Sequence, residues 1–380
     1  MIKVCIFIDW YIPGYKAGGP VKSLALLIEK LSKTEQYEFY VICRNTDYMD
    51  KQPYATVVSD QWNKLSPFVN VYYIANYNCS LSNYYKILQP IQPNILYING
   101  IWSYKFSILP LFLRIKSIDK RIISPRGMLN SSAIDIKSVK KKSFLLFARI
   151  FNIYKNYTFH FTNLEEKSES EKALPNIQNF SIISNFSAEY TFQTERVEKK
   201  VNEINLFFLG RISPEKNLQY ALECLVQINE VIVNFDIFGE VYNHKYWLDC
   251  KELIKKLPIN IRVNYFGFIK PNELKFKLGN YHYLFLPTAG ENFGHAISES
   301  LQAGIPVIIS DKTPWNAIGY GLGGFVVNLN NQKSFIEIIE KAAAENNTTY
   351  MARVGEVQKF VYQYINSTNL LEPYLALFSK

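Results

Sequence analysis

Two glutamates on one short segment are candidate functional residues because of the residues around them. Glu291 and Glu299 lie in a glycine-containing stretch that follows the apolar run His282 to Leu286. A strand, a glycine-containing loop and a helix in this order direct backbone N–H groups and the positive end of a helix dipole at an anion. Glu291 would then lie on the loop and Glu299 on the second helical turn. Without that loop, the two glutamates would be solvated side chains on an ordinary helix.

Two cations form a second candidate group. Arg211 and Lys216 follow the run Asn205 to Leu209, and between them Ser213 and Pro214 provide an N-cap and a first helical residue. Cations on a loop and first helical turn would neutralise a diphosphate leaving group without a metal ion. The alternative is surface charge that caps a helix.

A pair of glycines precedes the first predicted helix. Gly18 and Gly19 end the loop that follows the first apolar run, and a helix is predicted from Val21. Glycines at this position let the backbone approach a phosphate or a sugar closely. The pair is equally compatible with a simple turn.

The remaining reactive residues indicate neither a metal site nor disulfides. The four histidines are not clustered, no Asp-x-Asp motif is present, and the five cysteines are scattered without a Cys-x-x-Cys spacing. The chain starts directly with a strand-like run, Val4 to Ile8, and has no signal-peptide cleavage site. No apolar run approaches the roughly 20 residues that cross a bilayer. We therefore expect a cytoplasmic protein without a metal or other cofactor.

The net charge of the chain is +9. Such a charge favours an acidic partner, but nucleic acid, anionic lipid and a phosphorylated small molecule would all satisfy it. Charge alone does not choose among them.

Short β-rich runs alternate with helix-compatible segments such as Val21 to Leu31 and Tyr104 to Lys116. The β-rich runs are Lys3 to Ile8, Glu38 to Cys43, Asn70 to Ile74, Asn94 to Ile98, Arg121 to Ser124, Thr158 to Phe161, Asn179 to Ile183, Ile204 to Leu209, Val231 to Phe238, Ile261 to Phe266, His282 to Leu286, Pro306 to Ile309 and Gly324 to Val327. This alternation predicts βαβ units and mainly parallel sheets.

The length of 380 residues predicts two α/β domains, because single hydrophobic cores stop growing below this size. We expect a first domain over 1–188, a charged linker over 189–203 and a second domain over 204–365, with a C-terminal helix, 366–380, that could pack on the first domain. Ligands of open α/β sheets bind at the carboxyl ends of the strands. Two facing doubly wound, Rossmann-like domains would therefore hold the active site in the cleft between them.

The motifs, taken in order, resemble the retaining glycosyltransferases of family 4, which have the GT-B fold. The resemblance covers essentially the whole chain and is carried by Gly-Arg-Ile-Ser-Pro-Glu-Lys (210–216), the two glutamates within Pro-Thr-Ala-Gly-Glu-Asn-Phe-Gly-His (287–295), Ala-Gly-Ile-Pro-Val-Ile-Ile-Ser (303–310), Thr-Pro-Trp (313–315), Ser-Pro-Arg-Gly-Met-Leu (124–129) and His-Phe-Thr-Asn (160–163). These motifs are specific for the family but not for its substrate.

The resemblance implies a role for each matching residue. Arg211 and Lys216 would hold the donor diphosphate, and Glu299 the ribose. The other implied donor contacts are Glu291 and the backbone of Asn292, Phe293 and Gly294 for the sugar near its anomeric carbon, Phe268 and Ile269 for the nucleobase, and Gly18 and Gly19 for the phosphates and the acceptor. Many family members have His-Gly where this chain has Arg126-Gly127, so Arg126 could face the sugar, bind an acidic donor or an acceptor phosphate, or bind nothing.

The implied reaction transfers a hexosyl unit from a nucleoside diphosphate sugar to a hydroxyl group of a saccharide acceptor, with the anomeric configuration retained. No metal ion is expected, since the diphosphate would be stabilised by the two cations and by helix N-termini. The resemblance also suggests surface polysaccharide synthesis, such as O-antigen, with a lipid-linked acceptor.

Two alternatives are a sugar-nucleotide epimerase with the same fold, which the motifs disfavour, and a basic nucleic-acid-binding protein. The second is disfavoured because most aromatic residues lie within predicted strands or helices, as core residues do, so no nucleic acid partner is expected.

One basic segment bears on localisation. Lys137 to Asn156 combines lysines with Phe144, Phe147, Ala148 and Phe151 at helical spacing. A basic amphipathic helix can lie on an anionic leaflet, which would attach the protein peripherally to the inner face of the cell membrane. A core helix of the first domain with solvated lysines explains the pattern equally well.

Overall fold

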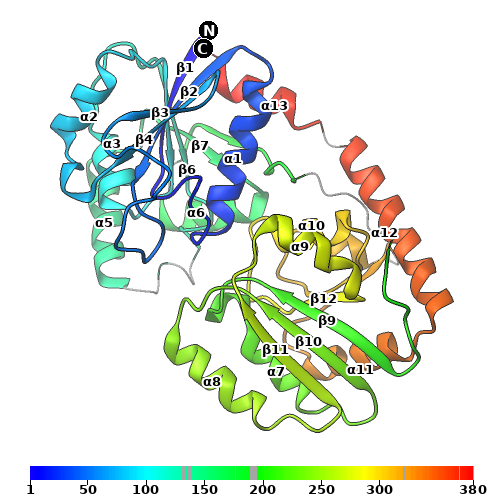
Figure 1. Ribbon diagram of the computed structural model, residues 1–380. Coiled ribbons are helices and arrows are strands. Elements are labelled where there is room, and N and C mark those ends of the chain that lie inside the picture. Colours follow the sequence, from blue (N-terminus) through cyan, green and yellow to red (C-terminus); the bar gives the residue numbers. More distant parts are fainter. Residues whose placement is uncertain are drawn as a thin grey trace. The chain divides into compact units, whose positions relative to one another are not determined.

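The computed structural model describes residues 1–130, 134, 138–175, 177–188, 195–319, 322–367 and 369–379. The chain divides into two compact units (Figure 1). The first unit consists of Met1–Phe186 and Asn369–Lys380, and the second consists of Ser187–Thr368.

The first unit is built on an eight-stranded sheet with the order β3-β4-β2-β1-β5-β6-β7-β8. All neighbouring strands are parallel except β3, which is antiparallel to β4. The strands are β1 (Ile2–Phe7), β2 (Tyr37–Arg44), β3 (Trp62–Ser66), β4 (Val69–Ile74), β5 (Ile95–Asn99), β6 (Lys120–Ser124), β7 (Thr158–Phe161) and β8 (Phe180–Ile182). Short apolar runs such as Ile95–Asn99 form buried strands here because helices cover both faces of the sheet.

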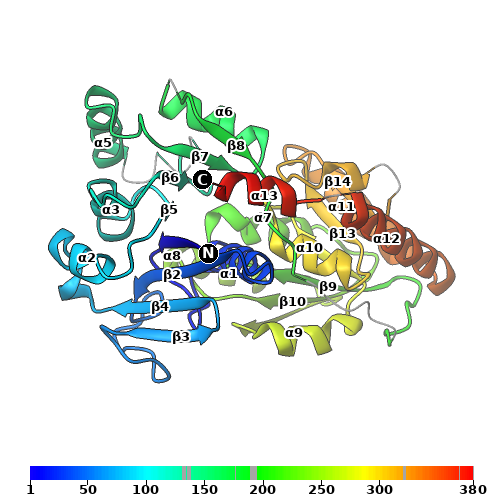
Figure 2. The same ribbon diagram turned by 90° about the horizontal axis from the view of Figure 1, so that it is seen from above.

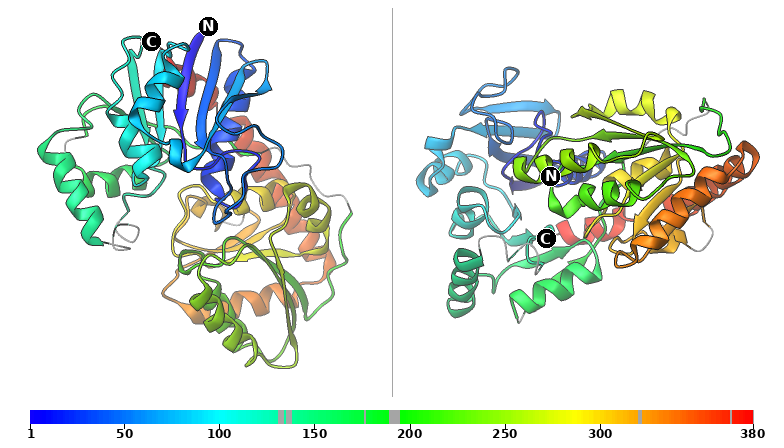
Figure 3. Two further views of the ribbon diagram at one scale, coloured as in Figure 1. Left: turned by 60° about the vertical axis from the view of Figure 1, so that its left-hand side comes forward. Right: turned by 90° about the horizontal axis from the view of Figure 1, so that it is seen from below.

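Alternate residues of β1 face two different cores. Val4 and Ile6 pack with the apolar stripe of α1 (Gly19–Ser32) and with α13 (Leu371–Phe378), whereas Cys5 and Phe7 pack on the opposite side. That opposite side is covered by α2 (Leu81–Leu88), α3 (Leu109–Leu111), α5 (Ser138–Ile150) and α6 (Leu164–Ala173). Figures 2 and 3 show α5 at the periphery of this unit.

The C-terminal helix α13 belongs to the first unit. The ring of Phe378 stacks on Tyr97 of β5 at 5.7 Å between centroids, and the Tyr374 hydroxyl donates to the carbonyl of Ser184 at 3.0 Å. Figures 1 and 2 show α13 beside α1. The last residues of the chain therefore complete the core that the first strand begins.

The second unit contains a six-stranded, all-parallel sheet with the order β11-β10-β9-β12-β13-β14. Its strands are β9 (Glu203–Leu209), β10 (Ile232–Phe238), β11 (Ile261–Gly267), β12 (Tyr283–Leu286), β13 (Val307–Ser310) and β14 (Gly324–Val327). Its helices are α7 (Leu218–Leu225), α8 (His244–Ile254), α9 (Pro271–Lys277), α10 (His295–Gln302), α11 (Gln332–Ala344) and α12 (Asn347–Ser367). Both units are thus doubly wound α/β domains, as the alternating pattern predicts.

Three local predictions were wrong. The predicted helix over 104–116 is a π-helical segment, Tyr104–Ile108, followed by the short α3, because Pro110 removes a backbone donor and the chain turns at Phe112. The strand β3 was not predicted, since its sequence, Trp62–Ser66, has little apolar alternation. The third concerns the start of the helix after β9 and is described with the site.

Part of the predicted linker packs into the second unit. Lys199 is 2% exposed, and its ammonium group donates to the carbonyls of Ala343 at 2.7 Å and Glu345 at 3.0 Å. Burial lowers the pKa of Lys199 to about 8. The guanidinium of Arg196 donates to the carbonyl of Ala303 at 2.6 Å. Residues 189–194 of the predicted linker lie outside the described residues.

Candidate active site

The sheet order of the second unit marks one edge as the ligand edge. Strand β9 has β10 on one side and β12 on the other. The chain adds β10 and β11 on one side of β9 and then adds β12, β13 and β14 on its other side, so the strand order reverses at β9. Loops at the carboxyl ends of the two strands flanking such a reversal form a crevice in which α/β proteins bind ligands. These two loops, after β9 and after β12, carry the cations and the glutamates singled out from the sequence.

The loop after β9 is tied to its neighbour strand and then makes a tight turn. Gly210 N–H donates to the carbonyl of Phe238 at 3.0 Å. A 3₁₀ turn, Pro214–Lys216, follows, and α7 begins only at Leu218. Ser213 is the N-cap of this turn and Pro214 its first residue, as predicted, but the Ser213 side chain makes no cap hydrogen bond and the turn does not continue directly into α7. Asn217 has a φ of 59° between the turn and α7, a left-handed conformation that Asn tolerates better than most residues.

The loop after β12 is joined to the first loop by several hydrogen bonds. Thr288 donates from its hydroxyl, and Ala289 from its N–H, to the same carbonyl of Glu215, each at 2.9 Å. The side-chain amide of Asn217 donates to the carbonyl of Pro287 at 3.0 Å. The two loops therefore form one rigid edge, which positions the side chains between them.

Lys216 and Glu291 meet at this edge as an ion pair between the ammonium group and Oε1. The side chains are 20% and 10% exposed, respectively. Glu291 is held from behind, since its N–H donates to the carbonyl of Lys312 at 3.0 Å. A partly buried ion pair therefore connects the loop after β9 with the loop after β12.

The residues after Glu291 form the start of helix α10. Gly294 is the N-cap with a φ of 78°, and a side-chain carbon there would lie 3.0 Å from Ile297 and 3.3 Å from the indole nitrogen of Trp315. That indole nitrogen donates to the carbonyl of Phe293 at 2.5 Å. A glycine is required here because of both backbone conformation and space. Asn292 precedes this turn and is partly exposed.

The other two predicted charged residues occupy different surroundings. Glu299 lies on α10 and is 6% exposed. The guanidinium of Arg211 lies over the ring of Tyr242, 4.6 Å from its centroid. Arg211 is therefore held by an aromatic face that the sequence did not single out, next to the loop after β10.

The predicted nucleobase residues follow β11. Phe268 is partly buried, whereas the Ile269 side chain is 8% exposed and belongs to the hydrophobic core. Gly239, after β10, was missed from the sequence. A side-chain carbon at Gly239 would lie 1.8 Å from the carbonyl oxygen of Gly210, so only glycine permits these loops to approach. The sequence could have indicated this residue, since Gly239 directly follows an apolar strand just as Gly210 does.

The first unit has the same reversal between β1 and its neighbours β2 and β5. Gly18 is the N-cap of α1 with a φ of 75°, and Gly19 is the first helical residue. The preceding loop is held by Asp47, which was missed from the sequence and accepts from the N–H groups of Tyr15 at 3.0 Å and Lys16 at 3.3 Å. A cavity of about 500 Å³ lies beside this loop, lined by Pro13, Tyr15, Asp47, Asp50, Lys51, Gln52, Pro53, Tyr54 and Ala55.

Arg126 is held by three side chains of the first unit. It donates to Asn99 Oδ1 at 2.8 Å, to Asn185 Oδ1 at 2.6 Å and to the Tyr97 hydroxyl at 3.0 Å. Its φ of 56° is left-handed, which is rare for a bulky residue.

The Tyr97 hydroxyl also lies 2.8 Å from Nδ1 of buried His160. Burial, followed by the charge of Arg126, lowers the pKa of His160 to about 3. This histidine therefore stays neutral near pH 7, and Arg126 forms part of a fixed polar network at its loop.

No group of three or more His, Cys, Asp or Glu with the geometry of a metal site is found in the part of the chain that the structure describes.

Comparison with known proteins agrees with this architecture. Residues 190–356 match the family model for glycosyl transferases group 1. Sucrose-phosphate synthase from Thermosynechococcus elongatus has a TM-score of 0.74 at 14% identity, over 100% of this chain and 99% of that chain. HepE from Anabaena, solved with UDP and glucose, has a TM-score of 0.67 at 15% identity, over 97% and 100%. An uncharacterized 41.2 kDa protein in the cps region of Klebsiella pneumoniae is 23% identical over 332 residues, 83% of this chain and 86% of that protein.

The two Rossmann-like domains and these structural likenesses define the GT-B fold. The family match over the second unit further supports a group 1 glycosyltransferase.

Proposed function

We propose that the protein is a retaining glycosyltransferase of family 4 that needs no metal ion. It transfers a hexosyl unit from a nucleoside diphosphate sugar to a hydroxyl group of a saccharide acceptor. The acceptor is carried by a lipid, and the product is a surface polysaccharide of the O-antigen type. The cps-region relative supports the polysaccharide pathway, and the UDP and glucose in the HepE structure support the class of donor.

The ion pair of Lys216 and Glu291 is the observation that carries this proposal. An ammonium group at the ligand edge of the sheet is suited to a diphosphate, and a carboxylate beside it is suited to the hydroxyl groups of the attached sugar. The N-terminal turn of α10 adds backbone N–H groups directed at developing negative charge. Departure of the diphosphate would be stabilised by these groups.

The cavity in the first unit supports a saccharide acceptor. It lies beside the loop that Asp47 holds in place, and it presents an aromatic ring, carboxylates, an amide and a cation. Tyr15 is 42% exposed, so its ring offers a face on which a sugar can pack. Lys16 and Asp50 form an ion pair at 2.6 Å at the edge of this loop.

The proposal is tested first by thermal unfolding with UDP, GDP and ADP and their common sugar conjugates. A ligand at about 100 times its dissociation constant stabilises the fold by roughly 2.7 kcal/mol, which corresponds to a shift of a few degrees. We expect one nucleotide family to stabilise the wild type and to lose this effect in Glu299→Gln. Glu337→Gln, which removes an exposed carboxylate of α11, is the matched control and should respond like the wild type.

Two outcomes would overturn the proposal. Stabilisation by oligonucleotides but by no nucleotide would favour a nucleic-acid-binding protein. Conversion of the sugar nucleotide into its epimer without an acceptor, measured by product analysis, would favour the epimerase.

We also propose peripheral attachment of the protein to an anionic membrane through α5. One face of this helix packs into the core through Leu145 and Ala148, whereas Leu146, Ile150 and, just after the helix, Phe151 are exposed. The exposed fractions of these three side chains are 58%, 65% and 63%, so this helix presents an apolar stripe to its surroundings. Exposed lysines, including Lys140 and Lys142, accompany the stripe, which is the composition of a helix that lies on an anionic leaflet.

The four residues noted at helical spacing lie in two different environments. Phe144 and Ala148 face the core, and Phe147 and Phe151 are exposed. Lys137 lies outside the described residues. Of the helices that the structure describes, none has the length and apolar character needed to span a bilayer.

Sedimentation with vesicles tests the attachment. We expect the protein to sediment with vesicles that contain phosphatidylglycerol, and Leu146→Ser with Ile150→Ser to weaken this at least tenfold, since each buried side chain contributes about 1.5–3 kcal/mol. Phe276→Ser, which removes an exposed apolar side chain from α9, is the control. Equal sedimentation of the double variant and the wild type would refute the role of α5.

A further inference from the structure

The second sheet has a row of polar residues where a parallel sheet is usually apolar. Parallel sheets are normally covered by helices on both faces, so their strands are apolar throughout. The register here places Arg262, Asn234 and Asn205 next to one another across three strands. It places Asn264 beside Asp236 one step further along. Five polar side chains therefore share one face of β9, β10 and β11.

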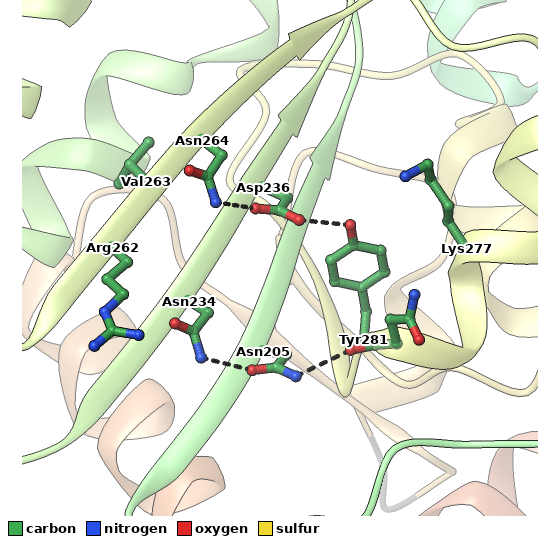
Figure 4. A pocket seen from close by; sticks show the side chains of 9 residues that line it. Asn205, Asn234, Asp236, Arg262, Val263, Asn264, Lys277 and Tyr281 are labelled. Atoms are coloured by element: carbon green, nitrogen blue, oxygen red, sulfur yellow. Dashed lines mark hydrogen bonds between the residues drawn. The ribbon is translucent and has the colours of Figure 1, made fainter.

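Hydrogen bonds hold the three asparagines and Asp236 in two rows (Figure 4). In one row, the Asn264 amide donates to Asp236 Oδ1 at 2.9 Å, and the Tyr281 hydroxyl donates to Asp236 Oδ2 at 2.7 Å. In the other row, Asn234 donates to Asn205 Oδ1 at 2.9 Å. Asn205 in turn donates to the carbonyl of Asn280 at 3.0 Å. The rows are therefore ordered before any ligand binds.

The two rows form the floor of a cavity of about 640 Å³, a size suited to a small-molecule ligand. Its lining consists of Asn205, Asn234, Asp236, Arg262, Val263, Asn264, Lys277, Asn280 and Tyr281. Val263 is the one aliphatic residue among them, so the cavity does not suit an apolar ligand. Arg262 and Lys277 come from opposite sides of the rows, from β11 and from α9 (Figure 4).

We propose that this cavity binds an acidic saccharide. Amides and a fixed carboxylate offer donors and acceptors to neighbouring hydroxyl groups of a sugar. The ring of Tyr281 lies against Phe207, 5.0 Å between centroids, and its hydroxyl is bound to Asp236, so the cavity does not rely on stacking against a sugar ring. Affinity must then come from charge-assisted hydrogen bonds, and the two cations select carboxylates or phosphates on the sugar.

This site is separate from the candidate active site of the same unit. The residues of the rows lie in the amino-terminal and middle parts of β9, β10 and β11. The loops that carry Lys216 and Glu291 follow the carboxyl ends of β9 and β12. Binding at this cavity would be a function in addition to the proposed transfer reaction, since a saccharide bound here would stay attached to the protein without being a substrate of that reaction.

Calorimetric titration with two matched trisaccharides tests this site. The probes are trigalacturonate, which carries carboxylates, and maltotriose, which does not, both at 0.15 M NaCl so that loose charge attraction is screened. We expect trigalacturonate to bind and maltotriose to bind at least tenfold more weakly. Asn234→Ala with Asn264→Ala leaves the charge unchanged and should weaken trigalacturonate about tenfold, since each lost hydrogen bond costs a few-fold. Asn229→Ala, an exposed asparagine of the loop before β10, is the control.

Three binding results would overturn the assignment. They are absence of trigalacturonate binding at millimolar concentration, equal binding of maltotriose, and equal binding by the double variant and the wild type, which would show that only net charge attracts the probe. The nucleotide-induced thermal shift of the double variant should match that of the wild type. Its loss would show that the cavity and the candidate active site are not independent, which also contradicts the proposal.

Discussion

Replacing Glu291 by glutamine should change ligand affinity and turnover in opposite directions. In the unliganded protein the ammonium group of Lys216 is paired with Glu291. A diphosphate must take the place of that carboxylate as the partner of Lys216. Glu291→Gln removes the competing charge, so we expect tighter binding of the nucleoside diphosphate. The same change removes a group that we place against the donor sugar, so turnover should fall.

The magnitudes follow from the burial of the pair. The side chains are 20% and 10% exposed, so solvent screens the pair and its contribution is about 1 kcal/mol. Removal of this competition should raise diphosphate affinity about fivefold. Lys216→Met removes a charge-assisted hydrogen bond of about 1.5–3 kcal/mol and should lower affinity roughly 10- to 150-fold. Loss of one group that stabilises the transition state typically lowers kcat about 10²- to 10³-fold, and we expect this of Glu291→Gln.

The assay is calorimetric titration of the nucleoside diphosphate, together with kcat from product formation. Glu215→Gln is the matched control, because Glu215 is an exposed carboxylate next to Lys216 in the chain. Glu215→Gln removes one negative charge from the neighbouring loop, which carries Lys216, without breaking the ion pair. If Glu291→Gln weakens diphosphate binding as much as Lys216→Met does, the carboxylate does not compete with the ligand and the reasoning fails. If Glu215→Gln tightens binding equally, only net charge matters.

Three further changes test the local structure. Gly294→Ala should lower the free energy of unfolding by about 1–3 kcal/mol in urea titration, because the backbone is left-handed and the added carbon would lie 3.3 Å from Trp315; unchanged stability would contradict this. Asn217→Ala should lower the free energy of unfolding by about 1–2 kcal/mol in the same assay, because alanine adopts a φ of 59° less readily and cannot make the amide hydrogen bond to the carbonyl of Pro287. Asn217→Gly should lower this free energy by less, because glycine adopts this φ readily. Burial, followed by the charge of Lys199, lowers the pKa of His282 to about 4, below its unfolded value of about 6.5. Between these two pKa values the unfolded chain binds more protons than the folded protein. The contribution of His282 to the free energy of unfolding is therefore complete above pH 6.5 and falls by up to about 3 kcal/mol towards pH 4. In urea titrations, His282→Gln should show a flatter pH dependence of this free energy between pH 4 and 6.5.

Much of the fold could be predicted because most of the buried strands, unlike β10 and β11, are short apolar runs. Thr158–Phe161 and Gly324–Val327 have the bounds that the sequence predicts. Such runs are distinct because a parallel strand is buried on both faces, which leaves no polar alternation. Trp62–Ser66 escaped prediction for the opposite reason, since this edge strand pairs on one side only and none of its residues is fully buried.

The site was predictable in its residue types but not in its contacts. The motifs indicated that Lys216 and Glu291 belong to one edge, whereas the ion pair between residues 75 positions apart depends on the order of the strands. The position of Arg211 over Tyr242 depends on the loop after β10, for which the sequence offered no motif. Asn217 illustrates the same limit. The motif gave no sign that Asn217 has a left-handed φ of 59°, a conformation that only the structure shows.

Arg126 shows how a departure from a family pattern can be understood from packing. Its guanidinium has five N–H donors, and three of them bind Asn99, Asn185 and the Tyr97 hydroxyl. A guanidinium held this firmly is a fixed positive charge rather than a mobile side chain, and it adds to burial, the larger cause, in lowering the pKa of the neighbouring His160. If Arg126 also meets a substrate, it would do so through its remaining donors, and an anionic group would be favoured. Arg126→Lys retains the charge but cannot make the three bonds, so a larger loss of stability than of ligand affinity would identify Arg126 as a positioning residue.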